Sequence, residues 1–161
     1  MRHWLMKSEP DVFSIDDLAR VGREPWTGVR NYQARNHMRD DMRVGDGVLF
    51  YHSSCAEPGV VGIARVASAP YPDPTQFERG SEYFDARSSR AQPRWMLVDI
   101  GFERRFARPV TLACLRAEPR LADCALLRRG NRLSVLPLTR AHWDTVLALA
   151  RSSNKPGTSQ P

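Results

Sequence analysis

Cysteine is scarce in this chain of 161 residues, and the few cysteines fit no metal or redox motif. Cys55, Cys114 and Cys124 are widely spaced and form no C-x-x-C pair, which argues against zinc ribbons and dithiol redox pairs. An odd number of cysteines favours a reducing compartment. The sequence therefore predicts no disulfide framework and no cysteine-based metal site.

Long apolar runs are also absent. No stretch approaches the roughly 20 residues of a membrane span, and residues 1–7 lack the apolar region of a signal peptide. We therefore expect a cytoplasmic, monomeric protein with no membrane partner. A hydrophobic fraction of 42% supports one domain, residues 1–151, and the polar composition of residues 152–161 predicts a disordered tail.

Lysine is nearly missing. Lys7 and Lys155 are the only lysines among 24 basic residues, which face 18 acidic ones and give a net charge of +6. A basic surface favours nucleic acid, because phosphate contacts release counterions. The near-exclusive use of arginine is equally explained by the bias of a GC-rich genome, so the charge alone leaves both interpretations open.

A catalytic set is missing as well. Ser53 follows His52, but adjacent strand residues point to opposite faces, and there is no G-x-S-x-G elbow. The histidines and aspartates show neither metal-ligand spacing nor an acid–base pair. We expect no enzymatic activity, no metal and no cofactor. An enzyme acting on nucleotides, the alternative, would have to start from Lys7, His52 or Glu9.

Strands and helices do not alternate regularly, which predicts an α+β fold with a mixed or antiparallel curved sheet. We interpret it as a small, partly open β-barrel with flanking helices and one mouth for a ligand. Residues 70–93 are rich in Pro, Ser and Asp and predict a long excursion. Expected strands are residues 3–7, 48–52, 60–68, 94–104 and 132–138; expected helices are residues 14–20, 32–42, 111–117, 121–129 and one following Thr139.

The segment 26–35, WTGVRNYQAR, has the composition of a loop that binds a flat polar molecule. Trp26 can stack on a base, or it can plug the end of the barrel. Asn31 can contact the ligand or cap the helix that begins at Tyr32. Tyr32 and Gln33 then lie in the first helical turn, where backbone N–H groups point outward.

Polar residues at the ends of other strands complete the candidate site. Lys7 and Ser8 end the first strand, and alternation places Tyr51 and Ser53 on one face of a later one. Arginines near these segments are candidates for phosphate contacts. The proposed ligand-binding residues are thus Lys7, Ser8, Trp26, Asn31, Tyr32, Gln33, Tyr51, Ser53, Arg132 and Ser134, with Arg30 and Arg35 as phosphate-binding residues.

Several of these segments, in this order, resemble the EVE domain family. The segments are WLMKSEP at 4–10, WTGVRNYQAR at 26–35, GD at 45–46, FYHS at 50–53, PGVVG at 58–62, YPDPT at 71–75, PRW at 93–95, VD at 98–99 and RLSV at 132–135, with Pro137. They span nearly the whole predicted domain. Thr27, Ser54 and Asn131 depart from the family's usual residues, and these departures bear on base preference.

The resemblance implies a PUA-like fold and a relationship to YTH domains, which hold a methylated adenine in an aromatic cage. By that similarity Trp26 forms one wall of a cage, and Lys7 and Ser8 line the same cleft. The resemblance also implies a module that binds a modified base in DNA or RNA, such as a modified cytosine or adenine, without catalysis. The open alternatives are an enzyme acting on modified nucleotides and a domain that binds a small molecule.

Overall fold

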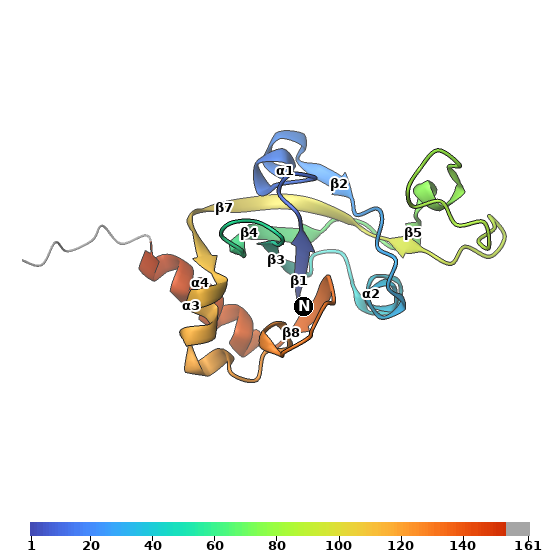
Figure 1. Cartoon of the computed structure of the whole chain (residues 1–161). Coiled ribbons are helices and arrows are strands. Elements are labelled where there is room, and N and C mark those ends of the chain that lie inside the picture. Colours follow the sequence, from blue (N-terminus) through green and yellow to red (C-terminus); the bar gives the residue numbers. More distant parts are fainter. Residues whose placement is uncertain (154–161) are drawn as a thin grey trace, which may run out of the picture.

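The protein is built on one curled, mixed β-sheet (Figure 1). The structure, a computed structural model, describes residues 1–153, so the predicted tail lies outside the described residues from residue 154 onward. The strand order is β2-β7-β4-β3-β1-β8, and a separate pair joins β5 to β6. The strands are β1 His3–Ser8, β2 Arg23–Pro25, β3 Gly47–His52, β4 Gly59–Val66, β5 Tyr71–Pro72, β6 Met96–Leu97, β7 Asp99–Thr111 and β8 Val135–Leu138.

The first strand has a neighbouring strand on each side in this sheet. It pairs in parallel with β3, from His3 opposite Gly47 to Ser8 opposite His52, and antiparallel with β8. Because β1 and β3 run parallel, Lys7 and Ser8 at the end of β1 lie at the same edge of the sheet as the end of β3. The polar residues that were predicted to gather at strand ends share this edge.

Irregular pairing curls the sheet into a half-barrel. The register of β3 with β4 shifts once, and that of β4 with β7 shifts twice, as β-bulges do when they bend a strand. Gly62 lies at one of these shifts, and a Cβ atom there would lie 2.4 Å from the carbonyl oxygen of Arg104. The predicted curved sheet of mixed strands is confirmed.

Both faces of the sheet are covered by helices. One core cluster joins Ile15 and Leu18 of α1 to Trp4 and Phe50 of the sheet, and a second contains Val146 of α4. In Figure 1, α1 and α2 lie away from α3 and α4. The helices are α1 Ile15–Val21, α2 Tyr32–Asn36, α3 Leu112–Ala117 and α4 Arg140–Ser153, with a π-helix η1 His37–Asp41 and 3-10 turns η2 Pro74–Phe77, η3 Pro119–Leu121 and η4 Ala125–Leu127.

Two predicted helices differ from the structure. The helix predicted for residues 32–42 changes to a π-helix at His37, and the one predicted for 121–129 is only a pair of short 3-10 turns. None of the helices within residues 1–153 is long and apolar enough to span a membrane. The capping residues were predicted correctly: Ser14 forms a capping box with Asp17, and the Thr139 hydroxyl accepts from the backbone N–H of His142.

The predicted excursion, residues 70–93, is folded and projects beyond the sheet at the right of Figure 1. Gln76 is fully buried within it, and its amide donates to the carbonyl oxygens of Asp73 and Trp95. The side-chain oxygen of Gln76 accepts from Ser88 and from the backbone of Trp95. A single amide thus ties the two ends of the excursion together, which makes it a wall rather than a loose loop.

Candidate functional site

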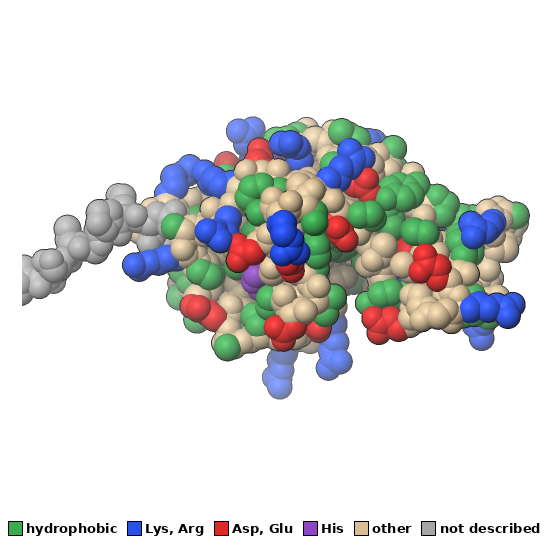
Figure 2. All heavy atoms as spheres, turned by 90° about the horizontal axis from the view of Figure 1, so that it is seen from above, with side chains coloured by type: hydrophobic (Ala, Val, Ile, Leu, Met, Phe, Trp, Pro, Cys, Tyr) green, Lys and Arg blue, Asp and Glu red, His purple; other side chains and the backbone are tan. Residues whose placement is uncertain are grey.

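A cleft of about 480 Å³ opens at the edge where β1 ends. This volume lies within the range of small-molecule sites and accommodates a nucleotide. Figure 2 shows the molecule hollowed between its main body and the projecting excursion. The walls come from four segments: Lys7, Ser8, Glu9, Val12 and Phe13; Glu24, Pro25, Trp26, Thr27, Gly28, Val29 and Arg30; Glu82 and Tyr83; and Ser134.

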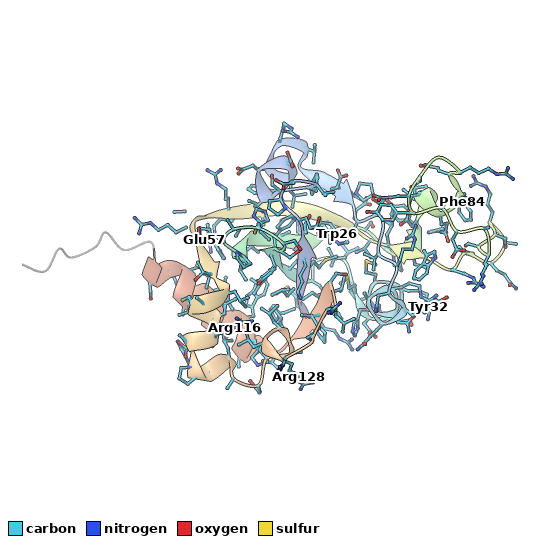
Figure 3. The ribbon with its side chains drawn as sticks, in the orientation of Figure 1. Trp26, Tyr32, Glu57, Phe84, Arg116 and Arg128 are labelled. Carbon is cyan, nitrogen blue, oxygen red and sulfur yellow. The ribbon has the colours of Figure 1, made fainter. Side chains whose placement is uncertain are left out.

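Trp26 is both a core residue and a wall of the cleft. It is 8% exposed, and its ring meets Phe50 and Phe13 edge-on at centroid distances of 5.6 and 6.5 Å. Its indole N–H has no hydrogen-bond acceptor within residues 1–153, whereas that of Trp4 donates to Asp46. The two interpretations of Trp26 are therefore compatible, since the residue (labelled in Figure 3) packs in the core and also lines the cleft.

Lys7 brings an unpaired cation to the cleft. Its ammonium lies 5.9 Å from the centroid of the Tyr51 ring and forms neither an ion pair nor a hydrogen bond within the described chain. Burial lowers the pKa of Lys7 below its ordinary value. A partly desolvated cation without a partner is costly, so such a group is a candidate for contact with a ligand.

The cleft is also lined by carboxylates. Glu9, Glu24 and Glu82 all line it. Burial raises the pKa of Glu24, and the nearby Asp99 carboxylate raises it further. A cation and several acceptors in one cleft suit a ligand edge that carries both acceptors and donors, as the edges of cytosine and adenine do.

The loop that carries Trp26 is held by Asp73 and Arg30. Asp73 accepts from the backbone N–H of Gly28 at 2.8 Å and from Arg30 at 3.0 Å. Burial alone would raise the pKa of Asp73, but hydrogen bonds from Thr75, Gly28 and Arg30 bring it below its ordinary value. The Tyr83 ring packs so tightly on Gly28 that a Cβ atom would lie 2.6 Å from it.

Arg30 is a structural brace, which corrects the expectation that its guanidinium is free for a phosphate. The side chain makes five hydrogen bonds: two to the Tyr83 carbonyl and one each to Val29, Asp73 and Thr75. A guanidinium has five N–H donors, so none remains.

Arg35 and Tyr32 lie outside the cleft, contrary to prediction. The Tyr32 ring stacks on Trp95 at 4.9 Å, and the guanidinium of Arg35 lies 4.7 Å from the Tyr32 ring. Arg35 also donates to the carbonyl of Arg94 and to the side chain of Asn36. This stack joins α2 to the excursion, so these residues support the wall and do not line it.

Asn31 and Gln33 are likewise not among the lining residues. The Asn31 side chain accepts from the backbone N–H of Ala34 and caps α2, which is the structural alternative named above. Gln33 is exposed in the first turn of that helix. Of the residues predicted from segment 26–35, the structure brings Trp26 and Arg30 to the cleft.

The residues predicted from β3 lie behind the cleft. Tyr51 is buried in the second core cluster, and Phe50 in the first, as alternation predicts. Ser53 follows the strand and does not line the cleft. His52 accepts at Nε2 from the backbone N–H of Ile15 at 3.1 Å, so that nitrogen caps α1 and is not available as a base.

Of the remaining predicted residues, Ser8 and Ser134 line the cleft, whereas Arg132 does not. Ser134 lines the cleft, and its carbonyl accepts from the backbone N–H of Lys7 at 2.8 Å. Ser8 also lines the cleft, but its hydroxyl donates to the Phe13 carbonyl. Arg132 is exposed on the loop that leads to Ser134, outside the cleft.

Sequence reasoning missed Glu24, Asp73 and Tyr83. Glu24 lies in the three-residue β2, which is too short to produce a recognisable strand pattern. Asp73 and Tyr83 lie in the excursion, and sequence separation hid their contacts with segment 26–35. Within residues 1–153, no three His, Cys, Asp or Glu side chains gather as metal ligands.

The half-barrel and its cleft define a PUA-like protein. An ASCH protein from Zymomonas mobilis shares this fold at a TM-score of 0.52 with 12% identity, covering 92% of this chain and 99% of that one. Residues 2–149 match the EVE domain, and the chain belongs to the EVE domain family.

Other proteins are similar to this chain over most of its length, in sequence and in structure. Human thymocyte nuclear protein 1 is 40% identical over 91% of this chain and 73% of its own length. A crystal structure of the human protein in complex with 5-methylcytosine-containing DNA matches at a TM-score of 0.89 and 39% identity, covering 98% of this chain and all of that one. A crystal structure of a protein from Pseudomonas syringae matches at a TM-score of 0.89 and 47% identity, covering 92% of this chain and 99% of that one.

Proposed function

We propose that this protein is a binding module that recognises a modified nucleobase in DNA, with the base inserted into the cleft beside Trp26. The observation that carries the proposal is the pairing of two unpartnered donors in one cavity. These donors are the Lys7 ammonium and the Trp26 indole N–H, neither of which has a partner within residues 1–153. The human relative bound to 5-methylcytosine DNA supports the same class of ligand.

The cleft offers what a base ring requires. Val12, Phe13 and Pro25 supply apolar surface for a flat ring and a methyl substituent. Lys7 can donate to acceptors on the base edge, and Glu24 can accept from an exocyclic amino group. A base must leave the stack to enter, at a cost of a few kcal/mol, which these contacts have to offset.

The test is a binding titration with four matched oligonucleotides, in single-stranded and duplex form. They carry cytosine, 5-methylcytosine, adenine or N6-methyladenine at one position. We expect tighter binding of one modified strand than of its unmodified counterpart. Trp26→Phe keeps a ring against Phe50 but removes the indole donor, so it should reduce that preference while the protein stays folded.

Equal affinity for all strands at every salt concentration would contradict the proposal. A matched control is Trp143→Phe, because Trp143 packs on His3 in a separate cavity. That variant should leave the preference unchanged.

We also propose that the module binds without turnover. The Nε2 atom of His52 is engaged by α1, and no nucleophile and base pair lines the cleft. Incubation with modified oligonucleotides and nucleosides should return them unaltered. A product formed over many turnovers, and lost in a Lys7 variant, would favour an enzyme instead.

A further inference from the structure

A group of four arginines lies on α3 and on the loop that leads to Ser134 of the cleft. Arg128, Arg129 and Arg132 lie on the loop between η4 and β8, and Arg116 lies on α3. All four are exposed, and no hydrogen bond or ion pair of their guanidinium groups occurs within residues 1–153. We call these four residues the basic rim. Figure 3 shows Arg116 and Arg128 on one side of the molecule, away from Tyr32 and Phe84.

The acidic residues near the basic rim are already paired. Glu118 is bound by Arg120 at 2.7 Å, and Asp123 is bound by His142 at 2.9 Å. The segment 125–134 itself contains no acidic residue. The charge of Arg128 also lowers the pKa of Asp123, after the hydrogen bond from His142, so this one carboxylate offsets part of the positive charge of the rim. The remaining positive charge is in excess, and like charges held close together repel each other until a polyanion binds.

Two of the rim arginines are related to residues in or behind the cleft, one through the chain and one through an electrostatic interaction. Arg132 precedes Ser134, a lining residue whose carbonyl is bonded to the backbone of Lys7. Arg116 lies near the Tyr51 phenol, where its charge counteracts the rise in the pKa of Tyr51 caused by burial. The Tyr51 ring in turn lies 5.9 Å from the Lys7 ammonium.

The loop of the rim is fixed by Asn131. Its side-chain oxygen accepts from the backbone N–H of Leu133 at 2.9 Å, and its amide donates to the carbonyl of Ala125 at 2.6 Å. These bonds hold the backbone on both sides of Arg132. A held backbone lowers the entropy that is lost when side chains bind a strand.

We infer that the phosphate backbone of a bound nucleic-acid strand follows the basic rim, while one base enters the cleft. The inference rests on the proposed function, and it assigns phosphate contacts to residues other than Arg30, whose donors are all engaged, and Arg35, which lies outside the cleft in the stack with Tyr32. Charge favours this path for the phosphates, because Glu9, Glu24 and Glu82 within the cleft repel them and the rim attracts them.

The test compares two double variants of equal charge. Arg129→Ala with Arg132→Ala removes two rim cations. Arg79→Ala with Arg87→Ala removes two exposed arginines of the excursion that also lack partners within residues 1–153. Affinities for modified and unmodified oligonucleotides are measured over a series of salt concentrations, after thermal unfolding has verified that each variant is folded.

The rim variant should reduce the slope of log K against log salt by about 1.4 units on single strands and about 1.8 on duplex. It should weaken modified and unmodified strands by the same factor, because phosphate contacts carry no sequence information. Replacing Arg129 and Arg132 by lysine should restore most of the slope. The excursion variant should leave the slope unchanged.

An unchanged slope in the rim variant would overturn the inference, and so would an equal loss in the excursion variant. Failure of the proposed function has a different signature. If the wild-type protein shows no preference for any modified base but the rim variant still loses slope, the rim binds nucleic acid and the assignment of the cleft is wrong.

Discussion

At Lys7 the chain keeps an ammonium group where burial works against its charge. Within the described residues, the ammonium group lies over the Tyr51 ring and forms no ion pair. We propose that this residue serves a ligand rather than the fold, because a partly buried charge without an ion pair adds little to stability. Trp26 differs, since its packing against Phe50 and Phe13 serves the fold as well as the cleft.

Lys7→Met should separate binding from stability. The methionine keeps the length and apolar stem of the side chain, so the free energy of unfolding in urea should stay the same or rise. Affinity for the preferred modified strand should fall by roughly tenfold or more, since a hydrogen bond from a charged group contributes about 1.5–3 kcal/mol. Unchanged affinity in a folded Lys7→Met protein would show that Lys7 does not touch the ligand.

Gly28→Ala should disturb the loop of the cleft. Gly28 has φ +84° and lies against the Tyr83 ring, so an added methyl group meets both backbone strain and overlap. The strain alone costs about 1–2 kcal/mol. Gly130→Ala is the matched control, because Gly130 has φ +78° and open space around it. Urea unfolding should show a larger loss at Gly28; equal losses would mean that the contact with Tyr83 is unimportant.

At the scale of elements, α1 depends on a neutral histidine. His52 accepts at Nε2 from the backbone N–H of Ile15, which leaves no place for a proton on that nitrogen. Burial lowers the pKa of His52 below 6.5, and Asp16 opposes this shift. A lowered pKa in the folded state gives stability that is present above pH 6.5 and lost as the pH falls through the lowered value.

The melting temperature should therefore fall as the pH is lowered below about 6.5, and His52→Gln should reduce that fall. The glutamine oxygen can accept the same hydrogen bond but does not titrate. The pKa of His3 is also lowered by burial, so part of the acid sensitivity should persist in the His52 variant. An identical pH profile in wild type and His52→Gln would contradict this role.

Elements with strong local signals were predictable, and those fixed by distant contacts were not. The caps at Ser14 and Thr139 act within a few residues and could be read directly from the sequence. The three-residue β2 exists because it pairs with β7, from Arg23 opposite Gly101 to Pro25 opposite Asp99, which are 78 and 74 positions apart along the chain. No local pattern encodes a partner so far along the chain.

The same limit applies to the site. Lys7, Ser8, Trp26 and Ser134 could be predicted because each lies at a strand end or in a loop with an unusual composition. The role of Arg30 could not, because it depends on contacts in the excursion more than 40 residues away.

At the scale of the whole molecule, the charge is distributed unevenly around one cleft. The net charge of +6 does not reveal that acidic residues gather in the cleft and that exposed arginines form the basic rim. On the face shown in Figure 2, cationic and anionic side chains are interspersed. The proposed recognition of a base by the cleft and the proposed attraction of phosphates by the rim involve different residues, so mutations can test them separately.

The central claim, that a base enters the cleft beside Trp26, is tested most directly by the indole N–H signals in an NMR titration. The chain has four tryptophans, so four signals are expected. The indoles of Trp4 and Trp95 are bound to Asp46 and Asp85, whereas that of Trp26 has no acceptor within residues 1–153. With the preferred modified oligonucleotide, the Trp26 signal should shift most, and much less with the unmodified strand. A Trp26 signal that stays in place at saturation would contradict the account.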